Sequence, residues 1–175
     1  MTFKGIHSVF FLGIGGIGMS GLARYFNKRG CVVAGYDRTP TTLTRELESE
    51  GIAVTYIDEV SEIHSEFLVH DPGTLVIYTP AIPKDSEIFN YFSNYDFVLR
   101  KRSQVLGIIS EGSFTIAVAG THGKTTTSSM IAHLLKDSGY DCSAFLGGIA
   151  SNYQSNVLFG DNNVMVVEAD EFDRS

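Results

Sequence analysis

Short apolar runs alternate with amphipathic stretches along the chain, a pattern typical of a parallel sheet covered by helices. The apolar runs predict strands at residues 9–12, 31–36, 52–56, 75–78 and 97–99. The stretches between them predict helices that begin near Ile17 and that cover 42–50, 86–92 and 103–109. We therefore expect an α/β domain in the first two thirds of the chain.

A second α/β unit is predicted to begin at Phe114, after a hinge at 111–113. We expect a strand at 114–119, a loop, a helix at 125–136, and strands at 141–146 and 164–167. The helix would carry its apolar residues on one side, namely Met130, Ile131, Leu134 and Leu135. We place the boundary so that the domains are 1–111 and 112–175. The second domain is expected to be incomplete, because a P-loop sheet needs more strands than these residues provide.

Composition narrows the class of protein. The 175 residues are 43% hydrophobic and 19% charged, as in ordinary globular proteins. No apolar run approaches the length of about 18 residues that spans a membrane, and no signal peptide is recognisable. The net charge of −7 argues against a nucleic-acid partner. Two widely separated cysteines, Cys31 and Cys142, suit a reducing cytoplasm and are read as buried apolar residues.

The first candidate site is a glycine loop at 13–18, Gly-Ile-Gly-Gly-Ile-Gly, between a predicted strand and a helix. This G-x-G-x-x-G spacing permits a tight turn and lets the backbone approach a pyrophosphate at the helix N-terminus. Asp37 ends the next predicted strand, where an acid that binds a ribose hydroxyl is expected. The loop indicates nucleotide binding without saying which nucleotide, and Asp37 is equally well explained as a turn residue.

The second candidate site, Gly120-Thr121-His122-Gly123-Lys124-Thr125, ends in the Gly-Lys-Thr of a P-loop. Lys124 would neutralise charge on the β- and γ-phosphates, and the Thr125 hydroxyl would ligate Mg²⁺. The motif departs from the usual spacing, because Val118 stands where the first glycine is expected and Gly120 would make the turn instead. The alternative is a glycine-rich helix start that binds nothing. We interpret His122 as a solvated loop residue.

An acidic segment follows the last predicted strand. Glu168 comes directly after the apolar run and is the preferred Mg²⁺ ligand, since the carboxyl end of a strand faces the nucleotide in P-loop folds. Asp170, Glu171 and Asp173 are better explained as a solvated turn.

The chain combines two different nucleotide cradles, and in this it resembles the Mur ligase family over essentially all 175 residues. The resemblance rests on the order and spacing of Gly13–Ser20, Ala119–Thr126 and Glu168–Glu171. The resemblance implies a Rossmann-like UDP-sugar domain followed by the truncated start of a P-loop ATPase domain. It also implies an ATP-dependent ligase of peptidoglycan precursor synthesis, which serves cell shape and division. The nearest likeness is to the member that joins L-alanine to UDP-N-acetylmuramic acid. Phe172 replaces the small polar residue of many relatives.

The resemblance also assigns roles to individual residues. The diphosphate of UDP-N-acetylmuramic acid would be cradled by Gly15, Gly16, Ile17, Gly18, Met19 and Ser20. Asp37 would lie near the uridine, and further sugar-nucleotide contacts would involve Thr79, Ala81 and Arg102. ATP would be bound by Gly120, Thr121, His122, Gly123, Lys124, Thr125 and Thr126, with Lys124 as the catalytic cation. Mg²⁺ would be held by Thr125 and Glu168.

Other functions stay open at this point. A nicotinamide-dependent oxidoreductase would explain Gly13–Gly18 and Asp37 but not the second cradle. A UDP-sugar-binding module with a vestigial P-loop would describe the behaviour of these residues alone, which we expect to bind without catalysing ligation. A family member that attaches a recycled peptide to the same sugar nucleotide is the hardest to distinguish.

Overall fold

The computed structural model describes residues 3–169. The chain separates into two compact units, which divide between Val105 and Leu106. This division falls inside helix α5 (Arg102–Glu111), and the boundary expected at 111–112 stays a prediction. In residues 3–169, no helix is long and apolar enough to cross a membrane.

The first unit is built on a parallel sheet. Its strands are β1 (Ser8–Leu12), β2 (Val32–Tyr36), β3 (Ala53–Thr55), β4 (Thr74–Tyr78) and β5 (Val98–Lys101). They lie in the order β3-β2-β1-β4-β5, which confirms the Rossmann-like fold. The chain leaves β1 toward β2 on one side and returns to β4 on the other, so the topology reverses at β1. Ligands of open α/β sheets bind at the carboxyl ends of the strands beside such a reversal.

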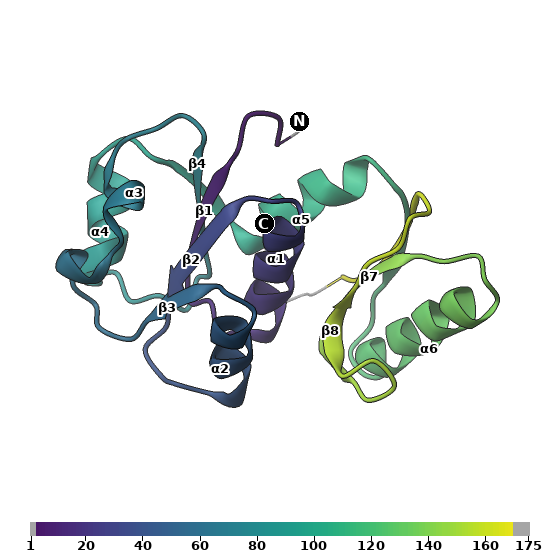
Figure 1. Ribbon diagram of the computed structural model, residues 1–175. Coiled ribbons are helices and arrows are strands. Elements are labelled where there is room, and N and C mark those ends of the chain that lie inside the picture. The colour runs from purple at the N-terminus through teal and green to yellow at the C-terminus, as the bar shows by residue number, and fades with distance from the viewer. Residues whose placement is uncertain (1–2, 170–175) are drawn as a thin grey trace. The chain divides into compact units, whose positions relative to one another are not determined.

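Helices cover both faces of this sheet (Figure 1). The helices are α1 (Ile17–Lys28), α2 (Thr42–Ser49), η1 (Val60–Glu62), α3 (Ser65–Leu68) and α4 (Glu87–Asn94). Phe11 of β1 packs toward Phe26 of α1, with ring centroids 6.4 Å apart. On the other face, Phe10 contacts Phe67 of α3 and Phe92 of α4. Successive side chains of β1 thus enter two apolar layers, which is why Val9 to Leu12 are all apolar.

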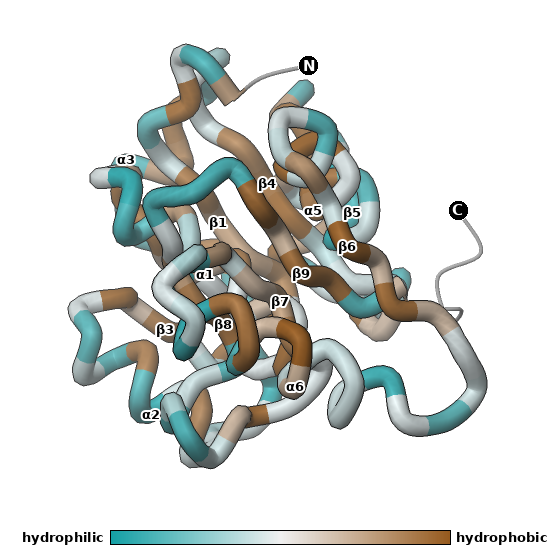
Figure 2. Tube along the Cα trace, turned by 90° about the vertical axis from the view of Figure 1, so that its right-hand side faces the viewer, coloured by the Kyte–Doolittle hydropathy of each residue, from teal (hydrophilic) through white to brown (hydrophobic). Residues whose placement is uncertain are grey.

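The second unit contains a mixed sheet in the order β6-β9-β7-β8, the larger part of α5 and the helix α6 (Lys124–Asp137). Its strands are β6 (Phe114–Val118), β7 (Ser143–Ala150), β8 (Ser155–Leu158) and β9 (Val164–Glu168). β6, β9 and β7 are parallel, and β8 pairs antiparallel with β7. Figure 2 shows β9 and β4 mostly in the brown of hydrophobic residues, in keeping with strands buried on both faces.

The apolar side of α6 is only partly covered by the sheet. Ile131 and Leu135 pack against the core of the second unit, whereas Met130 and Leu134 are 61% and 67% exposed. Residues four apart share a helix face, so the two pairs form neighbouring stripes, of which the sheet covers only one. Ser128 and Ala132 complete the buried side.

Candidate nucleotide-binding sites

Four predicted site segments of the first unit begin at one edge of its sheet. The strand registers pair Leu12 with Tyr36 and Tyr78, and Tyr78 with Lys101. The residues that directly follow these aligned strand ends are Gly13, Asp37, Thr79 and Arg102. The structure thus brings the glycine loop together with the three other segments that the sequence singles out for the sugar nucleotide.

The glycine loop is held to its neighbours by backbone geometry and by one carboxylate. Gly13 adopts φ +88°, which favours glycine, and its N–H donates to the carbonyl of Tyr36 at 2.8 Å. Gly15 N–H donates to Asp37 Oδ2 at 2.7 Å. Gly16 is the N-cap of α1, so the loop ends at a helix N-terminus, where backbone N–H groups favour an anion.

Two predicted diphosphate-binding residues have side chains turned into the protein. Met19 and Ser20 are 2% and 0% exposed, and the Ser20 hydroxyl donates to the carbonyl of Ile17 at 2.9 Å. Their side chains therefore lie between the first turn of α1 and the protein interior. Gly16, Ile17 and Gly18 are exposed or partly exposed.

Thr79 and Arg102 approach the glycine loop from β4 and β5. A Cβ atom added to Gly13 would lie 2.6 Å from the Thr79 methyl carbon, and one added to Gly18 would lie 2.8 Å from Arg102 Nη1. Both segments therefore approach the loop closely, and at Gly18 the neighbouring group is the movable end of the Arg102 side chain. Ala81 is exposed in the turn after Thr79, and its N–H donates to Thr79 Oγ1 at 3.4 Å.

The second cradle joins β6 to α6. Gly120 adopts φ +142° and Gly123 adopts φ +77°, both in the region that favours glycine. Gly123 is the N-cap of α6, which begins at Lys124. Lys124 Nζ donates to the Gly120 carbonyl at 2.7 Å, so the ammonium group folds over the loop. Thr121, His122 and Thr126 are exposed around it.

Glu168 lies beside this cradle. It ends β9 and pairs with Val118, the last residue of β6. Thr125 Oγ1 donates to Glu168 Oε2 at 3.1 Å, although the two residues are 43 positions apart. The structure therefore brings together the two predicted metal ligands.

The Thr125 hydroxyl and the Glu168 carboxylate are oxygen ligands that fit a magnesium ion. Mg²⁺ prefers oxygen ligands and usually takes one or two protein ligands, with phosphate and water completing its shell. Residues 3–169 contain no cluster of three or more acidic, histidine or cysteine side chains that could hold a metal by themselves. A carboxylate beside a P-loop hydroxyl matches the sparse set expected for a nucleotide-bound ion. Asp170, Glu171 and Asp173 lie outside the described residues.

The sequence reasoning missed two further groups that contact Glu168. Ser128 Oγ donates to Glu168 Oε1 at 2.9 Å, and Gly147 N–H donates to the same oxygen at 2.7 Å. A serine three residues beyond the P-loop threonine lies on the same helix face and could have been considered. Gly147 gives no such signal, because its position depends on how β7 pairs with β9.

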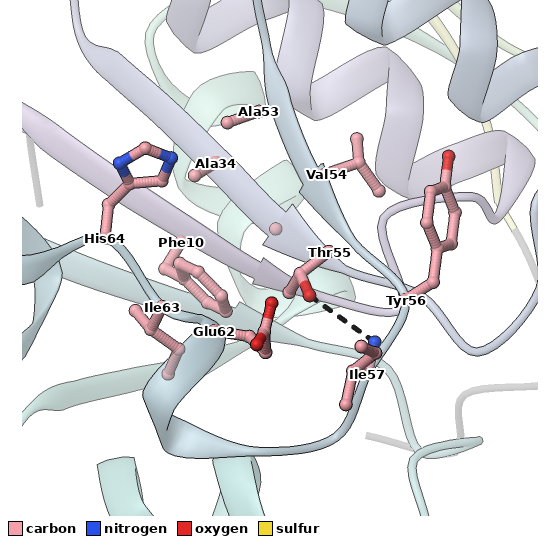
Figure 3. Close-up of a pocket in the computed structure, with 11 residues that line it drawn as sticks. Phe10, Ala34, Ala53, Val54, Thr55, Tyr56, Ile57, Glu62, Ile63 and His64 are labelled. Atoms are coloured by element: carbon pink, nitrogen blue, oxygen red, sulfur yellow. Dashed lines mark hydrogen bonds between the residues drawn. The ribbon is translucent and has the colours of Figure 1, made fainter.

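A pocket of about 430 Å³ lies elsewhere in the first unit, at β3 and η1 (Figure 3). Phe10, Ala34 and Ile63 contribute apolar surface, while Glu62 and His64 contribute polar side chains. None of the predicted site residues is among those that line it.

Comparison with known proteins agrees with these cradles. Residues 8–113 match the family model described as Mur ligase family, catalytic domain, and residues 118–165 match the Mur ligase middle domain. The chain belongs to the Mur ligase family. The resemblance of the chain to Mur ligases is thereby confirmed at the level of the family.

Curated Mur ligase relatives resemble the chain along its whole length. A UDP-N-acetylmuramate–L-alanine ligase from Flavobacterium psychrophilum is 53% identical over 175 residues, which are 100% of this chain and 39% of the relative. An enzyme of the same name from Cytophaga hutchinsonii is 52% identical over 179 residues, and the match covers 38% of it. The chain thus spans less than two fifths of the length of these relatives.

Solved Mur ligase structures share the fold. A UDP-N-acetylmuramate–alanine ligase from Thermotoga maritima superposes with a TM-score of 0.80 at 30% identity, covering 92% of this chain and 37% of that one. A UDP-N-acetylmuramate:L-alanyl-gamma-D-glutamyl-meso-diaminopimelate ligase from Neisseria meningitides gives a TM-score of 0.84 at 26% identity, covering 96% and 54%.

Proposed function

We propose that the whole protein is an ATP-dependent ligase that joins L-alanine to the carboxylate of UDP-N-acetylmuramic acid, a step of peptidoglycan precursor synthesis. The observation that carries this proposal is the pair of phosphate cradles, Gly13–Gly18 and Gly120–Thr126, each at the carboxyl edge of its own sheet. The whole-length identity to L-alanine ligases supports the choice of substrates. The free thiols of Cys31 and Cys142 suit a cytoplasmic location.

The reaction would need positioning and charge neutralisation more than a side-chain nucleophile. The γ-phosphoryl group of ATP would pass to the muramoyl carboxylate, giving ADP and an acyl phosphate. The amine of L-alanine would then attack the acyl carbon, giving the amide and releasing phosphate. Lys124 would neutralise phosphate charge as the catalytic cation, while the Gly15–Gly18 loop and Arg102 would hold the sugar-nucleotide diphosphate.

Thr125 and Glu168 would hold Mg²⁺, which supplies neutralisation of charge on the β- and γ-phosphates. Their mutual hydrogen bond of 3.1 Å keeps a hydroxyl and a carboxylate oxygen on the same side of the P-loop. We expect these 175 residues to bind both nucleotides without forming the amide, since they span only 39% of the relative from Flavobacterium psychrophilum.

Addition of a peptide to the same sugar nucleotide is the second candidate, and the fold match to the Neisseria ligase supports it. Both candidates share the first substrate, so the binding experiment below does not separate them. Turnover by the whole protein with L-alanine or with the tripeptide would separate the two candidates.

The test is calorimetric binding of this chain to UDP-N-acetylmuramic acid, with NADH as the comparison. We expect saturable binding of the sugar nucleotide and none of NADH. Binding of NADH alone would mean that the glycine loop serves an oxidoreductase and would overturn the proposal. ATP with Mg²⁺ is titrated separately, so that the two cradles are judged independently.

A further inference from the structure

The Glu168 carboxylate is held by three donors that come from two separate elements. Ser128 of α6 and Gly147 of β7 both donate to Oε1, whereas Thr125 of α6 donates to Oε2. Oε1 is thus bound by the buried Ser128 hydroxyl and by the Gly147 N–H, and Oε2 faces the P-loop threonine. A carboxylate with both its rotation and its position fixed is prepared to present a single oxygen.

Ser128 is the side chain that fixes this orientation. It is 0% exposed, while Thr125 is exposed. Its hydroxyl has one proton and two acceptors within reach, Glu168 Oε1 at 2.9 Å and the Thr125 carbonyl at 3.1 Å. A charged acceptor makes the stronger hydrogen bond, so the Ser128 hydroxyl directs its hydrogen toward the Glu168 carboxylate.

Gly147 contributes its backbone N–H, and only glycine allows this approach. An added Cβ atom would lie within 3.0 Å of both carboxylate oxygens and of the carbon between them. β7 pairs with β9 as far as Phe145 opposite Val167, which brings Gly147 beside the end of β9. The sheet therefore supplies one donor to Oε1 and the helix supplies the other.

We propose that Ser128, together with the Gly147 N–H, is a positioning residue for the Mg²⁺·ATP site, because it holds Glu168 so that Oε2 and Thr125 Oγ1 face the cation. This inference rests on the ATP role assigned above. It concerns a residue outside the P-loop motif that acts through Glu168 and does not touch the nucleotide. Groups that orient a metal ligand typically change metal affinity by about 10- to 100-fold when removed.

The experiment measures how much Mg²⁺ strengthens binding of the ATP analogue AMP-PNP to the 175-residue chain. Calorimetry is run with Mg²⁺ and with EDTA, and Mn²⁺ binding is followed by electron paramagnetic resonance. Ser128→Ala is expected to reduce the gain due to the metal by about tenfold and to leave the metal-free affinity unchanged. Ser128→Thr keeps a hydroxyl and should retain most of the gain. Ser129→Ala, one position along the same helix, is the matched control.

A double-mutant cycle separates positioning from a general packing role. In a Glu168→Gln background, Ser128→Ala should have no further effect on Mn²⁺ binding if Ser128 acts through the carboxylate. The inference would be overturned if Ser128→Ala kept the full gain in AMP-PNP affinity due to Mg²⁺. It would also be overturned if Ser128→Ala weakened Mn²⁺ binding equally in the unaltered chain and in the Glu168→Gln variant. If Ser128→Ala does not fold, Gly147→Ala provides the second variant, and the same gain in AMP-PNP affinity due to Mg²⁺ is measured for it. Failure of the unaltered chain to bind AMP-PNP with Mg²⁺ would instead refute the ATP site itself, and this inference with it.

Discussion

Gly15 N–H donates to Asp37 Oδ2 at 2.7 Å, so the acid at the end of β2 braces the glycine loop after β1. The other oxygen, Oδ1, accepts from Thr39 N–H at 3.2 Å. We predict that Asp37→Ala weakens binding of UDP-N-acetylmuramic acid by about tenfold, which corresponds to about 1.4 kcal/mol, near the low end of the contribution of one hydrogen bond to a charged group. Calorimetry measures the affinity, and Asp137→Ala, in the second unit, is the control.

Amide exchange distinguishes this brace from a direct ribose contact. Loss of the carboxylate should speed exchange of the Gly15 amide in the absence of any ligand, because the amide loses its acceptor. An unchanged exchange rate together with weaker binding would show that Asp37 acts on the nucleotide alone.

Gly15→Ala approaches the same contact from the loop. Its Cβ atom would lie 2.8 Å from Asp37 Oδ2 and 2.8 Å from the Thr44 methyl carbon. Thr44 is 0% exposed and exchanges two hydrogen bonds with Thr41 in the capping box of α2, so it cannot move aside easily. We expect a destabilisation of about 1–3 kcal/mol, measured by denaturant unfolding. Gly107→Ala in α5, whose Cβ would meet nothing within 4 Å, should be neutral or slightly stabilising; equal losses in both variants would contradict this reading.

Arg102 and Gly18 offer a coupled pair. Arg102 Nη1 would be 2.8 Å from a Cβ at Gly18, and a long side chain can move away from it. Gly18→Ala should therefore fold normally and displace the guanidinium group. We predict that Gly18→Ala and Arg102→Ala each weaken binding of UDP-N-acetylmuramic acid by about tenfold, and that the double variant is little weaker than either one. Strictly additive losses in calorimetry would show that the two residues act separately.

The predictable parts of the fold are those whose signal is contiguous in the sequence. β1, β4 and β9 consist mostly of apolar runs, and the two glycine loops are short motifs. Each of them can therefore be predicted from adjacent residues. The strand β8 was missed because the polar residues Ser155 and Asn156 open it and leave only Val157 and Leu158 as its apolar residues. The short η1 and α3 likewise carry no helical period of their own.

The candidate sites show the same limit. Glu168 could be predicted because a carboxylate directly after a buried strand reaches the nucleotide edge. Its partners Ser128 and Gly147 are 40 and 21 positions away, and only the strand order places them beside it. The approach of Arg102 to Gly18 also follows from the sheet, because β5 reaches β1 only through β4.

Asp141 makes the stability of the second unit depend on pH. Its carboxylate accepts from Lys136 Nζ, from Asp161 N–H at 2.8 Å and from Cys142 N–H at 2.9 Å. The hydrogen bond from Lys136, followed by that from Asp161, lowers the pKa of the Asp141 carboxyl below its ordinary value. A lowered pKa means that the folded state favours the charged form. The stabilisation is therefore complete above the unfolded-state pKa of about 4 and is lost as the pH falls through the folded-state value.

We predict that Asp141→Asn lowers stability at pH 7 by about 1 kcal/mol, because the partly exposed site discounts the worth of a charged contact. Asn tolerates the left-handed backbone at this position, where φ is +66°, so the change tests the charge and not the turn. Thermal unfolding at pH 7 and pH 3, with amide exchange in β7 as the local probe, should show the gap between the two proteins closing at low pH. Asp161→Asn keeps the backbone N–H that Asp141 accepts from, and so should leave the pH profile unchanged. A gap of the same size at both pH values would mean that the carboxylate contributes shape to the turn and not charge.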